Sequence, residues 1–365
     1  MKKFRLISLF AFIFAAGLFY SQSVSACTGI KITARDGSHI IARTMEWGGF
    51  NLKSNLILVP RGYTQRAILP TGRDGLLMKA KYGYTGIGVL EHNFVAEAVN
   101  EKGMVGELFY FPNYGESEKF VTDKKDISIT DAEFLAWVLG NFATIDEMIP
   151  ELRKIRLVEY GHGFQAPHYN IMDATGRQVV LEYYGGVFHV NENKIGVITN
   201  APYFEWHMTN LNNYVNMFAS MNKPRKISPD VTLKPFGVGS SSVGLPGDLT
   251  PPSRFVRAVF YLRTACPTSR GKNAVMQAFQ ILNNFDIPIG TEFNEEEREK
   301  MPDMLSATQW TTSTDTKALK FYYRTEWNSS IRCIDLNTIN FATAKYQVLP
   351  LDRVKENHVE YISFK

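Results

Sequence analysis

Short segments in which apolar and polar residues alternate, or in which apolar residues run together, predict β-strands toward both ends of the chain. Turn sequences separate several of them, including Asp36-Gly37 and Asp173-Ala174-Thr175-Gly176. The predicted strands span residues 30–33, 39–44, 56–59, 169–173, 178–183, 187–190, 195–199, 319–323 and 331–336. The chain after residue 26 therefore begins within a sheet.

Helical periodicity occurs between these groups of strands. Thr130-Asp131-Ala132-Glu133 has the form of a capping box before a helix with Phe134 and Trp137 on one face, and Thr144 opens a second helix. Two further helices are expected near Pro252 and over 274–282. This order predicts an α+β fold of antiparallel sheets with helices on their outer faces, a layered αββα sandwich in one domain over 27–365.

The first 26 residues have the layout of a secretory signal peptide. Lys2, Lys3 and Arg5 precede an apolar run over 6–20, and Val24-Ser25-Ala26 places small residues before a cleavage point at Cys27. An uncleaved membrane anchor is the alternative, but 15 apolar residues fall short of the roughly 18 to 20 that span a bilayer. We expect export, to the bacterial periplasm, and no stable membrane insertion.

Charge and cysteine content narrow the function classes. The 365 residues carry a formal net charge of +4, and removal of the leader takes away three of these positive charges. A nearly neutral chain gives no argument for nucleic-acid binding. Three cysteines are an odd number for an exported protein, so one is expected to be special. Cys266 and Cys333 could pair or could be small buried hydrophobic residues.

Cleavage before Cys27 would place two catalytic groups on one residue. These are a thiol nucleophile and a free α-amine, whose pKa of about 7.7 to 8.0 suits a general base near neutrality. Val24-Ser25-Ala26-Cys27 also fits a bacterial lipobox, in which both groups would be consumed by acylation. The strand that starts at Cys27 favours the nucleophile, because lipoproteins more often begin with a disordered tether.

Further motifs support the same choice. In chain order they are Cys27-Thr28-Gly29, Ala42-Arg43-Thr44-Met45-Glu46-Trp47, Val59-Pro60-Arg61-Gly62, Asn100-Glu101-Lys102-Gly103, Thr199-Asn200-Ala201-Pro202, Glu205-Trp206-His207, Gly244-Leu245-Pro246-Gly247-Asp248 and Pro252-Ser253-Arg254-Phe255. Together they closely resemble the choloylglycine hydrolase and penicillin V acylase family. The resemblance implies an N-terminal-nucleophile hydrolase fold and hydrolysis of a non-peptide C–N amide, with no metal or organic cofactor.

The resemblance also implies roles for individual residues. Cys27 matches the nucleophile, and Arg43 and Arg254 match two site arginines. Asn200 matches a side-chain donor to the oxyanion, which the backbone N–H of Tyr110 would complete. Glu46 stands where relatives usually carry Asp, the carboxylate that holds the α-amine, so this chain departs from the family by one methylene.

The expected substrate is a glycine- or taurine-conjugated bile salt, with penicillin V as the alternative within the family. Four aromatic residues could line an apolar substrate pocket, although each could instead belong to the core. They are Trp47, Phe50, Phe111 and Trp206. The resemblance further implies a homotetramer.

Overall fold

Two antiparallel sheets form the centre of the computed structural model, which describes residues 26–48, 51–90, 94–159, 167–300 and 307–364. The first sheet has six strands. Their order is β14 (Val197–Ile198), β1 (Cys27–Thr33), β2 (His39–Glu46), β17 (Thr308–Asp315), β18 (Lys320–Thr325) and β19 (Asn328–Asp335). As predicted, the sheet contains a strand that begins at Cys27, and β2 pairs with it along its whole length.

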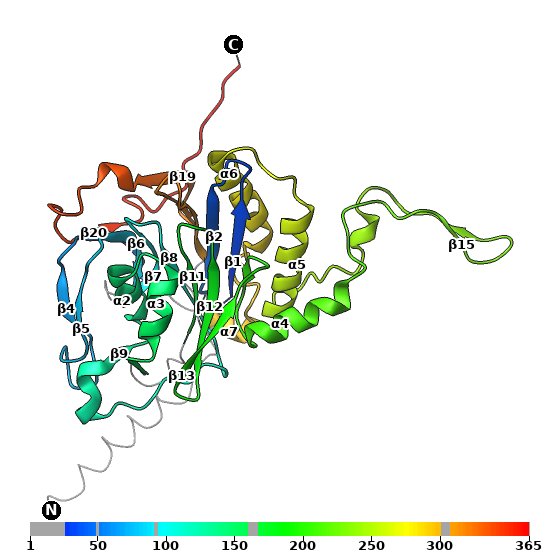
Figure 1. Cartoon of the computed structure of the whole chain (residues 1–365). Helices are drawn as coiled ribbons and strands as arrows, with labels where there is room; N and C mark the ends of the chain where they lie inside the picture. Colours follow the sequence, from blue (N-terminus) through cyan, green and yellow to red (C-terminus); the bar gives the residue numbers. More distant parts are fainter. Residues whose placement is uncertain (1–25, 49–50, 91–93, 160–166, 301–306, 365) are drawn as a thin grey trace, which may run out of the picture.

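The second sheet has eight strands and faces the first (Figure 1). Their order is β13 (Val187–Glu192), β12 (Gln178–Tyr184), β11 (His168–Met172), β8 (Val105–Phe109), β7 (Phe94–Asn100), β6 (Tyr84–Val89), β3 (Asn55–Val59) and β20 (Gln347–Pro350). Apolar side chains from both sheets, including Ile30, Ile87 and Val105, are fully buried in one cluster between them. This interior layer supports the strand that carries Cys27.

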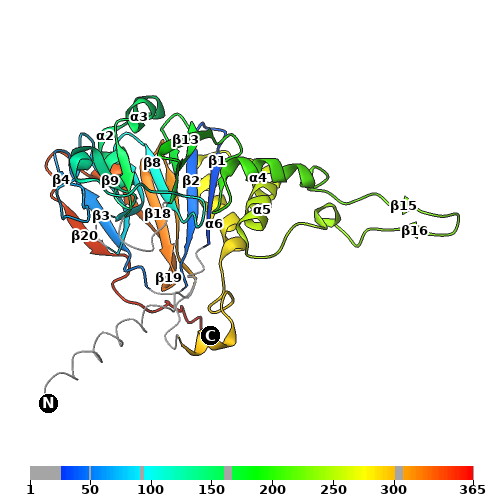
Figure 2. The ribbon, with the colours of Figure 1, turned by 90° about the horizontal axis from the view of Figure 1, so that it is seen from below.

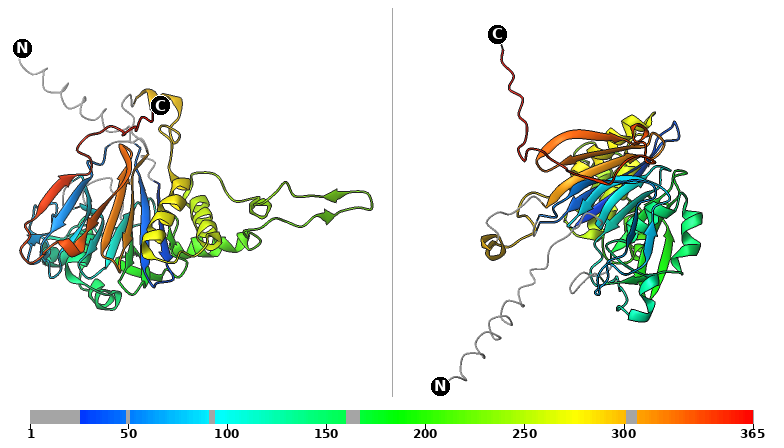
Figure 3. Two further views of the ribbon diagram at one scale, coloured as in Figure 1. Left: turned by 90° about the horizontal axis from the view of Figure 1, so that it is seen from above. Right: turned by 90° about the vertical axis from the view of Figure 1, so that its left-hand side faces the viewer.

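Helices cover the outer face of each sheet. Helix α2 (Phe134–Asn141) packs on β7 and β8, with α3 (Ile145–Leu152) beside it, whereas α5 (Pro251–Thr264) and α6 (Gly271–Leu282) pack on β1 and β2 (Figure 3). The result is a four-layer αββα sandwich, which confirms the predicted fold class.

The remaining elements are short. They are β4 (Thr64–Arg66), β5 (Leu77–Lys79), β9 (Ser128–Thr130), β10 (Arg156–Val158), α4 (Phe204–Asn210), α7 (Glu295–Glu299) and the 3₁₀ turns η1 (Thr122–Ile127), η2 (Leu211–Tyr214), η3 (Ser240–Ser242), η4 (Asn283–Phe285) and η5 (Leu336–Thr338). Among the described residues, no helix combines the length and apolar character that crossing a membrane requires.

An extended arm projects from the sandwich between α4 and α5 (Figure 2). It covers residues 215–245 and ends in a two-stranded hairpin, β15 (Arg225–Lys226) and β16 (Thr232–Leu233). Large apolar side chains along it face solvent. They are Val215, Phe218, Met221, Ile227, Val231, Leu233, Phe236, Val238 and Val243. Exposed apolar surface of this extent is typical of interaction sites.

One helix start differs from the prediction. Thr130 is the last residue of β9, and its hydroxyl donates to the Glu133 carboxylate at 3.2 Å, so Thr130 does not cap α2. The N-cap residue of α2 is Glu133, which makes no side-chain cap bond. The second start is confirmed, because the Thr144 side chain accepts a hydrogen bond from the Glu147 backbone at 3.2 Å. Cys266 and Cys333 are exposed and not bonded to each other.

Candidate active site

The first residue of β1 lies at the inner face of the six-stranded sheet. Cys27 pairs with Met45 of β2, and Gly29 pairs with Arg43, so these side-chain positions share one face. The Cys27 side chain is buried, with its Sγ 3.9 Å from Met45 Sδ. A Cβ at Gly29 would lie 2.7 Å from the Phe109 ring, so glycine is required where the two sheets approach closely here.

Asn200 and Arg254 hold the backbone around Cys27. The Cys27 N–H donates to Asn200 Oδ1 at 2.8 Å, and Arg254 Nη2 donates to the same oxygen at 2.7 Å. Arg254 Nη1 donates to the Cys27 carbonyl at 2.5 Å and to Thr28 Oγ1 at 2.9 Å. Arg254 lies in the first turn of α5, as predicted, and its guanidinium makes these contacts while fully buried.

The Asn200 side chain also contacts Tyr110. Its Nδ2 donates to the Tyr110 carbonyl at 2.8 Å, so the two residues expected to form the oxyanion hole are adjacent. Two histidines fix the backbone here. His207 Nε2 bonds to the Asn200 carbonyl and His168 Nε2 to the Thr199 carbonyl, both at 2.9 Å. Sequence reasoning assigned no role to either histidine, because neither belongs to a metal-binding or catalytic spacing, although His207 lies in the Glu205-Trp206-His207 motif.

Arg43 crosses the interior from β2 toward the eight-stranded sheet. Its Nη1 donates to the carbonyls of Leu108 and, at 3.5 Å, Ala96, and its Nη2 lies 3.7 Å from Met45 Sδ. The guanidinium also stacks 4.3 Å from the centre of the Phe109 ring. Arg43 is fully buried, so its charge lies inside the protein, on the Cys27 face of the sheet.

Burial is the largest influence on the Cys27 thiol. It raises the pKa of the thiol above its ordinary value, while the positive charges of Arg43 and Arg254 oppose the rise and Glu46 adds to it. The arginines therefore favour the thiolate in direction, as predicted, but they do not outweigh desolvation. A thiol in this setting needs a base to remove its proton near neutral pH.

Glu46 is fully buried, so its carboxyl is not a solvated acid at the end of the strand. Its backbone N–H donates to the Ala26 carbonyl at 3.1 Å, so the residue lies beside the Ala26–Cys27 peptide. Burial raises the pKa of the Glu46 carboxyl to about 8, against the opposing charges of Arg254 and Arg43 and a hydrogen bond with Thr44. Such a carboxyl ionises near neutrality when a further positive charge faces it.

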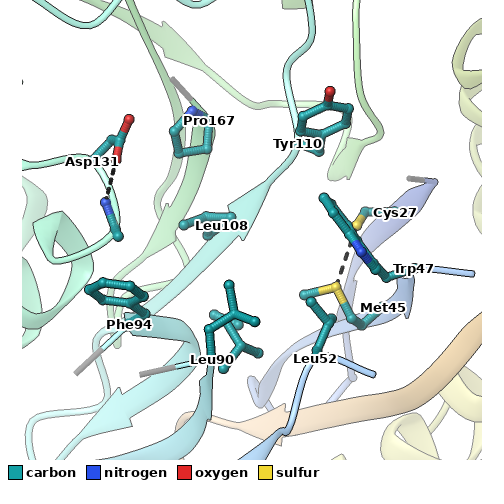
Figure 4. A pocket seen from close by; sticks show the side chains of 13 residues that line it. Cys27, Met45, Trp47, Leu52, Leu90, Phe94, Leu108, Tyr110, Asp131 and Pro167 are labelled. Atoms are coloured by element: carbon teal, nitrogen blue, oxygen red, sulfur yellow. Dashed lines mark hydrogen bonds between the residues drawn. The ribbon is translucent and has the colours of Figure 1, made fainter. Parts of the chain in front are cut away.

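An apolar cavity of about 100 Å³ adjoins Cys27 (Figure 4). Its lining comes from both sheets and the loops at their ends. The lining residues are Cys27, Met45, Trp47, Leu52, Val89, Leu90, Phe94, Ala96, Leu108, Tyr110, Asp131, Ala132 and Pro167. The Asp131 carboxylate is already engaged, since its two oxygens accept hydrogen bonds from Ala132 N and Ser117 Oγ.

The four aromatic residues proposed for substrate binding separate in space. Trp47 lines the cavity and meets the Tyr110 ring edge-on, with ring centres 5.6 Å apart. Phe111 is fully buried, stacks 4.3 Å from His168 and does not line the described cavity, so it belongs to the core. Trp206 is 45% exposed on α4 and also lies off this cavity. Phe50 falls outside the described residues.

Comparison with known proteins identifies the family. The model of the linear amide C–N hydrolases, choloylglycine hydrolase family, matches residues 27–349. The chain belongs to this family and is therefore an amide hydrolase. It is 31% identical over 321 residues to the bile salt hydrolase/transferase of Clostridium perfringens (strain 13 / Type A), covering 86% of this chain and 93% of that protein.

Two further comparisons agree with the fold. A crystal structure of a variant of the conjugated bile acid hydrolase from Clostridium perfringens matches with a TM-score of 0.79 and 28% identity, covering 92% of this chain and 100% of that one. The penicillin V acylase from Agrobacterium tumefaciens matches with a TM-score of 0.70 at 21% identity, covering 91% and 95%. The architecture is thus that of the N-terminal-nucleophile hydrolases.

Proposed function

We propose that this chain hydrolyses conjugated bile salts with Cys27 as its nucleophile, after removal of residues 1–26. The observation that carries the proposal is the position of the thiol. Cys27 begins β1, lies at the end of an apolar cavity and has its backbone nitrogen 2.8 Å from Asn200 Oδ1. Removal of residues 1–26 would place an α-amine beside this buried thiol. With the Asn200 side-chain amide and two arginines nearby, such a thiol is suited to acyl transfer.

The proposed reaction uses the freed Cys27 amine as the general base. The amine, directly or through one water, takes the thiol proton, and sulfur attacks the amide carbon to form a tetrahedral oxyanion. Asn200 Nδ2 turns from the Tyr110 carbonyl toward this oxygen, which the Tyr110 N–H also binds. The protonated amine then gives its proton to the leaving nitrogen, the C–N bond breaks, and water hydrolyses the thioester.

Two relatives of known name support the choice of substrates. The bile salt hydrolase/transferase of Clostridium perfringens, at 31% identity, supports a conjugated bile salt as the first candidate. Penicillin V is the second candidate, because the penicillin V acylase of Pectobacterium atrosepticum is 26% identical over 339 residues, covering 86% of this chain and 81% of that protein.

The deciding experiment measures amine release from glycocholate, taurocholate and penicillin V side by side, at one enzyme concentration. Faster release of glycine or taurine supports the bile salt proposal. Faster release of the penicillin nucleus selects the second candidate with the same mechanism. No release from any of the three would reject both substrates.

We also propose that the exposed arm mediates self-association, in line with the homotetramer expected from the family. The Phe236 and Val238 side chains project from it almost fully exposed. Phe236→Ser combined with Val238→Ser should convert the assembly to smaller species in light scattering, because burial of these side chains would drive association. Phe364→Ser, at an equally exposed position outside the arm, is the matched control. A monomeric parent protein would contradict the proposal.

Glu46→Gln should lower kcat about 10- to 100-fold, because the amine loses the group that orients it. Loss of the negative neighbour also lowers the pKa of the ammonium form. The acidic limb of the pH–rate profile, where the amine loses its proton, should therefore move to lower pH, by about one unit.

Glu46→Asp separates charge from reach at the same position. The aspartate retains the negative charge, so the acidic limb of the pH–rate profile should stay in place. The rate should fall if the surrounding strands are shaped for the longer glutamate side chain. A Gln variant with the parent rate and an unmoved profile would assign the amine to another partner.

A further inference from the structure

Two glutamates face each other inside the sandwich, near Arg43. Glu97 of β7 and Glu107 of β8 are directly opposed in the strand register, and both are fully buried. Opposed residues on adjacent antiparallel strands have Cβ atoms about 4.5 to 5.5 Å apart. Two carboxylates at this separation repel each other strongly when both are ionised.

Neutral donors bond to one oxygen of each of the two carboxyls. Thr312 Oγ1 of β17 donates to Glu97 Oε2, and Asn170 Nδ2 of β11 donates to Glu107 Oε2 at 2.7 Å. The Oε1 atom of each glutamate is buried and has no hydrogen-bond partner among the described residues. A carboxylate has no proton to donate, so a direct bond between these two groups requires that one of them is protonated.

Arg43 supplies the positive charge that acts on both carboxyls. It reaches the pair from the opposite sheet, and its Nη1 donates to the carbonyls of Ala96 and Leu108, the chain neighbours of Glu97 and Glu107. The other groups that act on the pair, Thr312 and Asn170, are neutral. One buried cation therefore faces two buried acids.

The pKa values of the two carboxyls agree with one negative charge on the pair opposite one cation. Burial and then the charge of Glu107 raise the pKa of Glu97 well above its ordinary value, and Arg43 opposes the rise. Burial raises the pKa of Glu107 to about 7, again against Arg43. At neutral pH the site is thus expected to retain one proton.

We propose that Glu97 and Glu107 share one proton and one negative charge, and that this charge positions the Arg43 guanidinium beside the Cys27 thiol. The contact runs from Arg43 Nη2 to Met45 Sδ and from Met45 Sδ to Cys27 Sγ. The glutamates are positioning residues, since they act through Arg43. The inference rests on the proposed role of Cys27 and adds the residues that set its electrostatic surroundings.

A shared charge has a distinctive consequence for substitutions. Glu97→Gln or Glu107→Gln leaves one carboxyl that can still ionise opposite Arg43, so each single variant should keep one negative charge beside the guanidinium. The double variant removes both of these counter-charges and leaves Glu46 as a carboxyl on which Arg43 still acts. The positive charge of Arg43 then acts more strongly on the thiol and should move thiolate formation to lower pH, by about one unit.

The test measures the rate of Cys27 alkylation by iodoacetamide as a function of pH, with the modified residue located by mass spectrometry. This readout needs no substrate. Profiles of the two single variants should match the parent protein, and that of the double variant should shift to lower pH. Equal shifts in the two single variants that add in the double variant, or an unshifted double variant, would overturn the shared charge.

Glu133→Gln is the matched control, because Glu133 is another buried carboxyl and accepts a hydrogen bond from Ile68 N. It should lower the melting temperature without moving the alkylation profile. If the double variant does not fold, adding Arg43→Met removes the unbalanced cation and should restore folding; failure to do so would overturn the charge balance. Unimpaired amide hydrolysis after alkylation of Cys27 would instead reject the proposed function.

Discussion

Cys27→Ser is expected to lower kcat by about 10⁴-fold or more, as loss of a catalytic nucleophile does. Burial already raises the pKa of the thiol, and a hydroxyl in the same place is much harder to ionise. Serine is close to cysteine in size, so the fold should survive. Amine release measures the rate, and a thermal unfolding curve checks that the variant is folded.

Cys333→Ser is the matched control for this substitution. Cys333 is an exposed cysteine on β19 that forms no disulfide, so its replacement should leave turnover unchanged. A Cys27→Ser enzyme within a few-fold of the parent rate would remove Cys27 from the mechanism.

Retention of residues ahead of Cys27 should be as damaging as loss of the thiol. A protein that begins Met-Ala-Cys27 and does not process itself keeps the Cys27 nitrogen as an amide, which cannot accept a proton as a base. Ala26 would also stay packed against Ile287 and Ala307, beside the first residue of β1. The expected loss is again about 10⁴-fold in kcat relative to a protein that begins at Cys27.

Intact mass of the N-terminus must accompany this measurement. Full activity with the two extra residues still attached would reject the amine as base. The same measurement on protein made from the full chain separates the two proposed fates of residues 1–26. A free N-terminal cysteine agrees with cleavage and export, whereas added diacylglyceryl and acyl groups would identify a lipoprotein.

Burial on both faces did not by itself hide a strand from the sequence, since β2, β11 and β12 are buried along nearly their whole length and were predicted. Predicted segments at 30–33 and 39–44 correspond to β1 and β2. Strands β7 and β17 were missed, because polar residues interrupt their apolar pattern, as Glu97 does in β7. In β17 the buried residues are mostly Thr and Ser, which single-sequence patterns associate with turns and loops.

The candidate site was predictable where motifs carried it. Cys27, Asn200 and Arg254 were named from the sequence and meet through hydrogen bonds, although their catalytic roles stay predictions. Side-chain direction was not predictable for the aromatic residues. Phe111 turns into the core, while neighbouring Tyr110 lines the cavity, and this difference depends on the backbone path after β8 rather than on residue type.

The hydrogen bonds of Arg254 also constrain how the molecule acquires activity during folding. This one guanidinium joins segments 227 and 54 residues away in the chain, at Cys27 and Asn200. Contacts between residues so distant in sequence form late, since the entropy of closing long loops must first be overcome. The six-stranded sheet depends on contacts of similar range, because β2 pairs with β17 and Glu46 lies opposite Thr308, 262 residues further along the chain. Since Arg254 of α5 holds the proposed nucleophile Cys27, we expect activity to return only once α5 docks against β1, which makes recovered activity a stricter measure of native structure than recovered secondary structure.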